Sequence, residues 1–184
     1  MNTERIILGI DPGTTIMGYG LIKCTNTKLE LITLGVLKLG SYADQPLKLK
    51  KIFERTLGLI DQYHPDEMAL EAPFYGKNIQ SMLKLGRAQG VAMAAGLYRS
   101  IPIVEYSPKK IKQSITGNGN ASKEQVAAML NRLVKIEEIP ESNDATDGLA
   151  AAVCHYFQKK PGSESKSYTG WKAFVTDNPK RLTK

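Results

Sequence analysis

Two acidic residues stand at the ends of short apolar runs in this chain of 184 residues. Asp11 follows residues 6–10, and Glu71 follows residues 68–70. Both runs have the length and composition of buried strands. Ligands of open α/β sheets bind beyond the carboxyl ends of the strands, so acids at these ends can share one site. If the two strands are neighbours, the carboxylates lie about one strand spacing, near 5 Å, apart.

A second pair of acids lies far along the chain. Asp144 and Asp147 are three residues apart in the first turn of an expected helix, which places them on one face. Residues 148–154 are apolar on every side, so this helix is expected to be buried. Buried carboxylates need partners, and these acidic motifs contain no lysine or arginine. Two Mg²⁺ ions would balance four carboxylates and are suited to hard oxygen ligands.

The same four residues also have simpler interpretations. An aspartate at a helix start, such as Asp144, is usually a cap or a partner of the helix dipole. Asp11 before Pro12-Gly13 is typical of a turn. Glu71 is the hardest to explain in this way, because a carboxylate at the inner end of an apolar strand is costly. Taken together, the four acids are the set that a two-metal clamp on an in-line phosphoryl displacement needs.

Basic residues are concentrated in two parts of the chain, whose net charge is +7. Residues 77–123 contain eight basic residues and one acid, and residues 159–184 contain seven and two. This pattern suits a polyanion bound on one face. Cys24 and Cys154 lack the spacing of a zinc site and are expected to be reduced and buried. The sequence shows no signal peptide and no run near the ~18 apolar residues of a membrane span, so we expect a cytoplasmic protein.

Several side chains between the two acidic motifs could contact a nucleic acid. Lys77, Lys84 and Arg87 share one face of an expected helix, which could contact phosphates or be solvated surface. Phe74 and Tyr75 lie in the loop before that helix. These two aromatic residues could stack on bases or close the end of the core.

The periodicity of the chain predicts an α/β fold. Three antiparallel strands open the chain, and Gly18 and Gly20 are expected to lead into the second of them. The strand at 68–70 is expected to run parallel to the first through a right-handed crossover. A sheet of about five strands with helices on both faces accommodates these elements. The expected strands are 6–10, 21–23, 29–39, 68–70 and 103–106, and the expected helices are 46–63, 78–99, one starting at Pro108 after a Ser107 cap, 122–133 and 143–158.

Small residues recur every four positions along the long expected helix, at Gly86, Gly90 and Ala94. A glycine inside a helix costs about 1 kcal/mol relative to alanine, so two of them indicate a packing reason. The simplest reason is the close approach of another backbone, either the sheet or a symmetry mate.

Taken in order, these motifs resemble those of the RuvC family of bacterial Holliday junction resolvases. The resemblance covers about residues 5–157 and implies a ribonuclease H-like fold, a mixed five-stranded sheet with helices on both faces. It also implies a homodimer that nicks four-way DNA junctions symmetrically during recombination and repair. The implied cofactor is Mg²⁺, two ions per active site, with Mn²⁺ able to substitute. The motifs are Ile10-Asp11-Pro12-Gly13, Gly18-Tyr19-Gly20, Leu70-Glu71, Lys77-Asn78 and residues 83–90 and 143–150.

The resemblance also assigns roles to individual residues. The junction-wedging aromatic residue falls on Phe74, and lysines near the active site fall on Lys112 and Lys123. The RuvA–RuvB branch-migration complex is the implied partner, besides the junction itself. The catalytic, metal-binding carboxylates fall on Asp11, Glu71, Asp144 and Asp147.

Residues 1–158 are expected to form the nuclease domain, and residues 159–184 a basic, largely flexible tail in which Trp171 could anchor a short ordered piece. Other functions stay open on the residues alone. A non-catalytic DNA-binding module would use the basic residues and keep the acids for structure, and a related nuclease could act on RNA. Actin-like ATPases and sugar kinases share the Asp-x-Gly-Thr-Thr pattern of residues 11–15. They need two such domains, for which 184 residues leave little room.

Overall fold

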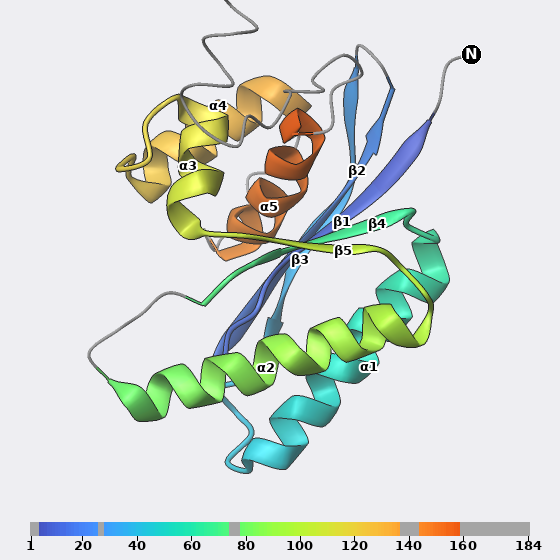
Figure 1. Cartoon of the computed structure of the whole chain (residues 1–184), viewed down its shortest axis with the longest axis vertical. Coiled ribbons are helices and arrows are strands. Elements are labelled where there is room, and N and C mark those ends of the chain that lie inside the picture. Colours follow the sequence, from blue (N-terminus) through green and yellow to red (C-terminus); the bar gives the residue numbers. More distant parts are fainter. Residues whose placement is uncertain (1–3, 26–27, 74–77, 137–143, 159–184) are drawn as a thin grey trace, which may run out of the picture.

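The structure is a computed structural model that describes residues 4–25, 28–73, 78–136 and 144–158. In these residues five strands form one sheet with the order β3-β2-β1-β4-β5 (Figure 1). β1 pairs antiparallel with β2 and parallel with β4, and β4 pairs parallel with β5. The predicted mixed sheet, with its fourth strand parallel to the first, is confirmed. The strands are β1 (Arg5–Asp11), β2 (Ile16–Cys24), β3 (Leu29–Lys38), β4 (Glu67–Glu71) and β5 (Ile103–Tyr106).

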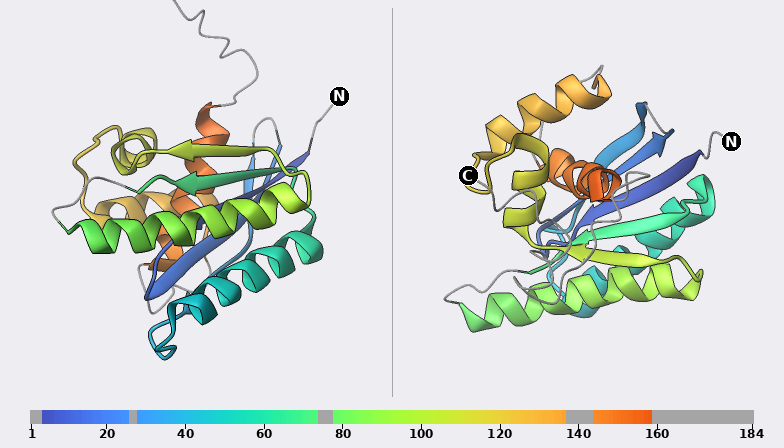
Figure 2. Two further views of the ribbon diagram at one scale, coloured as in Figure 1. Left: turned by 60° about the horizontal axis from the view of Figure 1, so that its bottom comes forward. Right: turned by 45° about the horizontal axis from the view of Figure 1, so that its top comes forward.

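Helices cover both faces of the sheet, as the two views of Figure 2 show. α1 (Gln45–Tyr63) and α2 (Ile79–Tyr98) lie on one face, and α3 (Pro108–Thr116), α4 (Lys123–Val134) and α5 (Asp144–Gln158) lie on the other. Each face has its own core, because successive strand residues point to opposite sides. In β1, for example, Leu8 and Ile10 pack with α1 and α2, while Ile7 packs with α5.

Local capping starts the two helices that follow β5. The Ser107 hydroxyl accepts a hydrogen bond from the backbone N–H of Lys110 at 3.2 Å, and Pro108 occupies the first turn. Ser122 and Gln125 form the predicted capping box at the start of α4. Each side chain in that box satisfies a backbone N–H of the other residue. These caps determine where α3 and α4 begin.

The structure corrects one expectation about glycines and narrows another. β2 begins at Ile16 and not at Leu21, so Gly18 and Gly20 lie inside the strand and do not precede it. Gly86 and Gly90 do not meet the sheet, because a methyl group added at either would have no described atom within 4 Å beyond its own helix backbone. The other expected reason, the approach of a symmetry mate, stays a prediction. Gly96 marks the close approach of α2 to the sheet, where an added methyl would lie 3.1 Å from the Met68 sulfur.

Phe74, Tyr75, Lys77 and the tail at 159–184 lie outside the described residues. The predictions made for them therefore stay predictions. Among the described helices, none combines the length and apolar character that crossing a membrane requires.

Candidate active site

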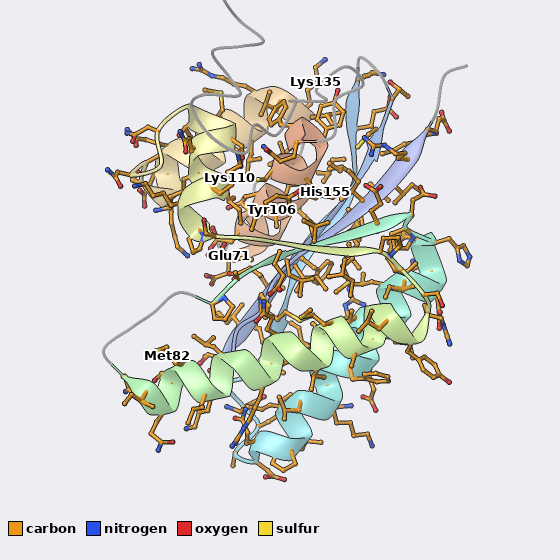
Figure 3. All side chains as sticks on the ribbon, in the orientation of Figure 1. Glu71, Met82, Tyr106, Lys110, Lys135 and His155 are labelled. Carbon is orange, nitrogen blue, oxygen red and sulfur yellow. The ribbon has the colours of Figure 1, made fainter. Side chains whose placement is uncertain are left out.

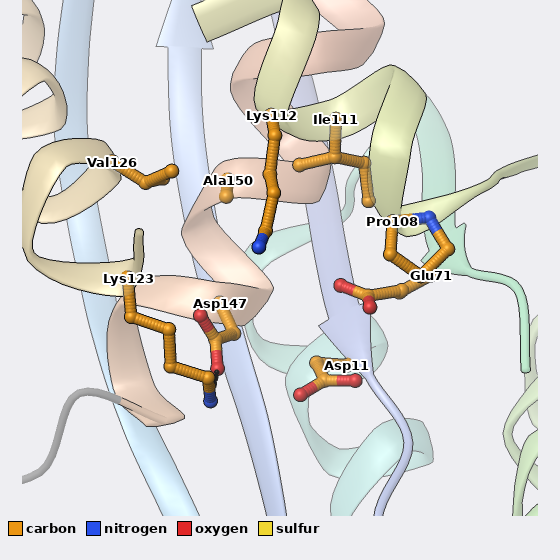
Figure 4. Close-up of a pocket in the computed structure, with 9 residues that line it drawn as sticks. All are labelled: Asp11, Glu71, Pro108, Ile111, Lys112, Lys123, Val126, Asp147 and Ala150. Atoms are coloured by element: carbon orange, nitrogen blue, oxygen red, sulfur yellow. Dashed lines mark hydrogen bonds and ion pairs between the residues drawn. The ribbon is translucent and has the colours of Figure 1, made fainter. Parts of the chain in front are cut away.

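Asp11 and Glu71 end two neighbouring parallel strands at the same edge of the sheet. β1 and β4 pair in a register that places Ile10 beside Leu70, so the two acids are the next residues on their strands. The strand ladder continues past Glu71, where the N–H of Ala72 donates to the β5 carbonyl of Tyr106 at 2.9 Å. Both acids line one hollow of the surface (Figure 4).

α5 brings the second acidic pair to the same edge. Asp144 and Asp147 lie in its first turn. Asp147 has 16% of its side chain exposed and lines the hollow with Asp11 and Glu71 (Figure 4). Asp144 has 37% of its side chain exposed and does not line the hollow. The fold therefore gathers three carboxylates from three separate segments, with the fourth one turn away along α5.

Glycines allow α5 to lie directly on the sheet. A methyl group on Gly18 would collide with the backbone carbonyl of Asp144, and one on Gly148 would lie 2.5 Å from Cα of Tyr19. Contacts this short leave no space for a side chain at either position. The glycines thus set the distance between α5 and β2, and with it the position of the aspartates.

Two lysines from the helical face enter the hollow. Lys112 of α3 and Lys123, the first residue of α4, both line it (Figure 4). Nζ of Lys123 lies 2.6 Å from Oδ2 of Asp147 and 3.6 Å from Oδ1 of Asp144. The acidic motif contains no basic residue, as expected, but the aspartate pair has a basic partner in Lys123, which the resemblance places near the active site. The partner comes from another helix and not from the acidic motif.

Burial and mutual repulsion oppose ionisation of the two strand acids. Burial, reinforced by the charges of Asp11 and Asp147, raises the pKa of Glu71 to about 8. Burial, followed by the charge of Asp147, raises the pKa of Asp11 to about 6. Lys123 opposes both shifts, and its hydrogen bond to Asp147 raises its own pKa. Fully ionised, the three carboxylates of the hollow would outnumber its two lysines, so the hollow favours a proton or a bound cation.

The chemistry of this donor set fits a hard divalent cation, because carboxylate oxygens are the ligands that Mg²⁺ prefers. The described residues do not contain three acidic, histidine or cysteine side chains gathered closely enough to enclose an ion. Beside Asp147 the counter-charge is the Lys123 ammonium group. The residue types match those of a Mg²⁺ site, but the described side chains do not by themselves enclose an ion. Lys123 balances part of the negative charge of the carboxylates.

A buried polar network ties the neighbouring strands to α5. The Tyr106 hydroxyl lies 2.7 Å from Nδ1 of His155 (Figure 3). Nε2 of the same ring lies 2.7 Å from Oε2 of Glu67 at the start of β4, and Arg5 reaches that carboxylate at 3.3 Å. A neutral ring that carries its proton on Nε2 satisfies both contacts, because it donates to Glu67 and accepts from Tyr106. Since Tyr106 pairs with Glu71, the network anchors the strand edge beside the site.

The other predicted contacts on α2 are not part of this hollow. Lys84 and Arg87 are exposed on the helix surface. Gln89, for which the sequence predicted no individual role, is buried on α2 with 7% of its surface exposed and donates a hydrogen bond to the carboxylate of Glu105. The available signal was a glutamine among the alanines of the buried helix face.

Comparisons with known proteins agree on one family. The family model described as crossover junction endodeoxyribonuclease RuvC matches residues 7–155. A protein of that name from Christiangramia forsetii is 65% identical over 182 residues, which is 99% of this chain and 95% of the relative. Another from Bacteroides fragilis is 59% identical and covers 97% of this chain and 96% of its own length.

A solved structure supports the same assignment. T. thermophilus RuvC in complex with a Holliday junction substrate superposes with a TM-score of 0.79 at 29% identity. The match covers 85% of this chain and 95% of that protein. This chain has a ribonuclease H-like fold and belongs to the RuvC family of crossover junction endodeoxyribonucleases.

Proposed function

We propose that this chain resolves four-way DNA junctions as a metal-dependent, structure-selective endodeoxyribonuclease in recombination and repair. Membership of the RuvC family supports an endodeoxyribonuclease that acts on such junctions. The observation that carries the proposal is the gathering of Asp11, Glu71 and Asp147 with two lysines in one hollow. Cations beside clustered carboxylates suit a phosphodiester substrate, because the lysines attract the phosphate that the acids alone would repel.

The proposed cofactor is Mg²⁺, two ions per active site, with Mn²⁺ as a substitute. Bound to these carboxylates, such ions would neutralise phosphate charge and lower the pKa of the attacking water. Without them, Lys123 and a proton retained on Glu71 offset part of the negative charge. The proposed catalytic ligands are the carboxylates of Asp11, Glu71, Asp144 and Asp147.

The proposed DNA contacts divide into those at the cut and those along the arms. Lys112 and Lys123 bring positive charge to the hollow, where they can hold oxygens of the phosphodiester to be cut. Exposed basic residues of α2 can contact phosphates of the junction arms, and an aromatic residue between β4 and α2 can stack on a base at the branch point. The full set is Phe74, Tyr75, Lys77, Lys84, Arg87, Lys112 and Lys123.

A second copy of the chain is the proposed partner of α2. Four of the five large apolar side chains exposed in the described residues belong to this helix, namely Ile79, Leu83, Leu97 and Tyr98. Gly86 and Gly90 are also exposed and leave open space for an approaching backbone. Ile79, Leu83, Gly86 and Gly90 follow one another at spacings of four, three and four residues, so they share one helix face that suits helix-to-helix packing in a two-fold symmetric dimer. A homodimer supplies the two active sites that symmetric nicking needs.

The proposal also includes the wider setting of the enzyme. The nuclease domain spans residues 1–158, and the tail at 159–184 adds basic charge that can contact phosphates non-specifically. RuvA–RuvB is the proposed branch-migration partner, and the cytoplasm is the proposed location.

The decisive experiment compares a synthetic four-way junction with a linear duplex of matched sequence, each incubated with the protein with and without Mg²⁺. We expect paired nicks in the junction only when Mg²⁺ is present. Asp11→Asn and Asp147→Asn should abolish nicking while retaining junction binding, because each removes a metal ligand and a negative charge near phosphate. Asp44→Asn is the matched control, since this exposed carboxylate makes no side-chain cap bond.

Junction binding in a gel shift without any nicking in Mg²⁺ or Mn²⁺ would favour a non-catalytic DNA-binding module. Equal nicking by wild type and the two site variants would show that the carboxylates of the hollow do not carry the reaction. Cutting of RNA in preference to the junction would favour an RNA nuclease.

A further inference from the structure

The carboxylate edge separates two hollows that differ in charge. Asp11 and Glu71 line both of them. The hollow on the side of α3, α4 and α5 contains Lys112 and Lys123. The hollow on the side of α2 contains no basic residue among its described lining residues, which are Asp11, Pro12, Gly13, Glu71, Ala72, Pro73, Leu85 and Gln89.

This composition is unsuited to a phosphate group. Apart from the two acids and Gln89, the α2-side hollow is lined by small or apolar residues, namely Pro12, Gly13, Ala72, Pro73 and Leu85. It has about 590 Å³ of empty space including its open mouth. An uncharged planar group fits such a surface, because it gains apolar contact and brings no further negative charge toward the acids. In a DNA substrate that group is a nucleobase.

Gln89 gives the hollow a polar group with a defined orientation. A carboxylate can only accept hydrogen bonds, so Glu105 requires that the amide nitrogen of Gln89 faces it. Glu105 lies on β5 directly beside Leu70, the residue before Glu71. The contact leaves the amide with its carbonyl oxygen and its second N–H, an acceptor and a donor. A side chain that offers both is suited to reading the edge of a base.

We infer that Gln89, oriented by Glu105, contacts a base beside the cleaved phosphodiester and determines sequence preference at that position. The inference rests on the proposed function. The hollow that contains the lysines takes the phosphate, and the α2-side hollow takes the neighbouring base. Gln89 is the specificity-determining residue, and Glu105 is a positioning residue that acts through it.

The test measures kcat/KM on junctions that differ by one base at each position flanking the nick. Wild type should discriminate among the four bases at one of these positions. In Gln89→Leu the ratio of best to worst base should fall about 10-fold there, the scale of one lost amide-to-base contact. Gln62→Leu is the matched control, because this exposed glutamine lies near the end of α1, away from the hollow.

Variants of Glu105 keep the test decisive if Gln89→Leu fails to fold, since Glu105 is exposed on β5. Glu105→Ala should reduce the same ratio, and Glu105→Gln, which can still accept from the amide, should restore most of it. An unchanged base preference in Gln89→Leu, or in Glu105→Ala where that variant alone folds, would overturn the inference while leaving nuclease activity in place. A wild-type enzyme that cuts the junctions with all four bases equally well would also overturn the inference. A wild-type protein that cuts no junction in Mg²⁺ would instead refute the proposed function, and the inference with it.

Discussion

Replacing Glu71 with glutamine should stabilise the metal-free protein at alkaline pH, although it removes a proposed catalytic group. Burial, with the charges of Asp11 and Asp147, raises the pKa of Glu71 from 4.5 to about 8. A carboxyl group with a higher pKa in the folded chain binds its proton more tightly there than in the unfolded chain. The stability it contributes is therefore full below about pH 4.5 and is lost as the pH rises toward 8.

The size of the effect follows from the two pKa values. Each pH unit between them corresponds to about 1.4 kcal/mol, which sets a ceiling on the order of 4–5 kcal/mol. Water enters the open hollow and Lys123 offsets part of the charge, so we expect an effect of about 2 kcal/mol at pH 8. For a chain of this length, that free energy corresponds to a change in Tm of about 4–8 °C.

Thermal unfolding in EDTA across the range from pH 5 to pH 8 measures this effect. Glu71→Gln should have a higher Tm than wild type at pH 8, and this difference in Tm should become smaller as the pH is lowered. Mg²⁺ should narrow the difference at pH 8, because it compensates the charge that only wild type carries. The exposed control Asp44→Asn should follow the wild-type pH dependence. A Glu71→Gln protein that melts below wild type at pH 8 in EDTA would refute the reasoning, and so would a difference that does not depend on pH.

Two further predictions concern packing and assembly. Gly148→Ala should lower the free energy of unfolding by about 1–3 kcal/mol in a urea titration, because its methyl would lie 2.5 Å from Cα of Tyr19. Gly58→Ala, with open space at its added methyl, should be neutral or stabilising, and equal losses in the two variants would contradict this account. Leu83→Glu should convert a dimer into a monomer in analytical ultracentrifugation, whereas Leu47→Glu on α1 should not change the mass. A monomeric wild-type chain would show that the exposed face of α2 does not mediate self-association.

Elements that depend on neighbours in sequence could be predicted from the sequence. The starts of α3 and α4 follow from Ser107 and Ser122, whose cap bonds reach only three residues along the chain. The order of strands and helices follows from apolar periodicity, and the parallel pairing of β1 and β4 follows from the crossover between them. Asp11 and Glu71 could be placed together for the same reason, because each is the last residue of its strand.

Features that depend on contacts between distant segments could not be predicted in this way. Gly18 has the local character of a turn residue, yet it lies in β2, where the absence of a side chain makes room for α5. The partner of Asp147 is Lys123, which is 24 residues away and on another helix. Nothing in the acidic motif specifies it.

The sequence alone determined which residues could do chemistry, because side-chain type and strand or helix position are local properties. Only the tertiary structure decided their surroundings. It assigned Lys123 to the aspartates, left the Gly86 face of α2 exposed and placed Gln89 beside the strand acids. The physical reason is that charge interactions weaken with distance in space, and burial depends on which segments pack together. Separation along the chain determines neither of them.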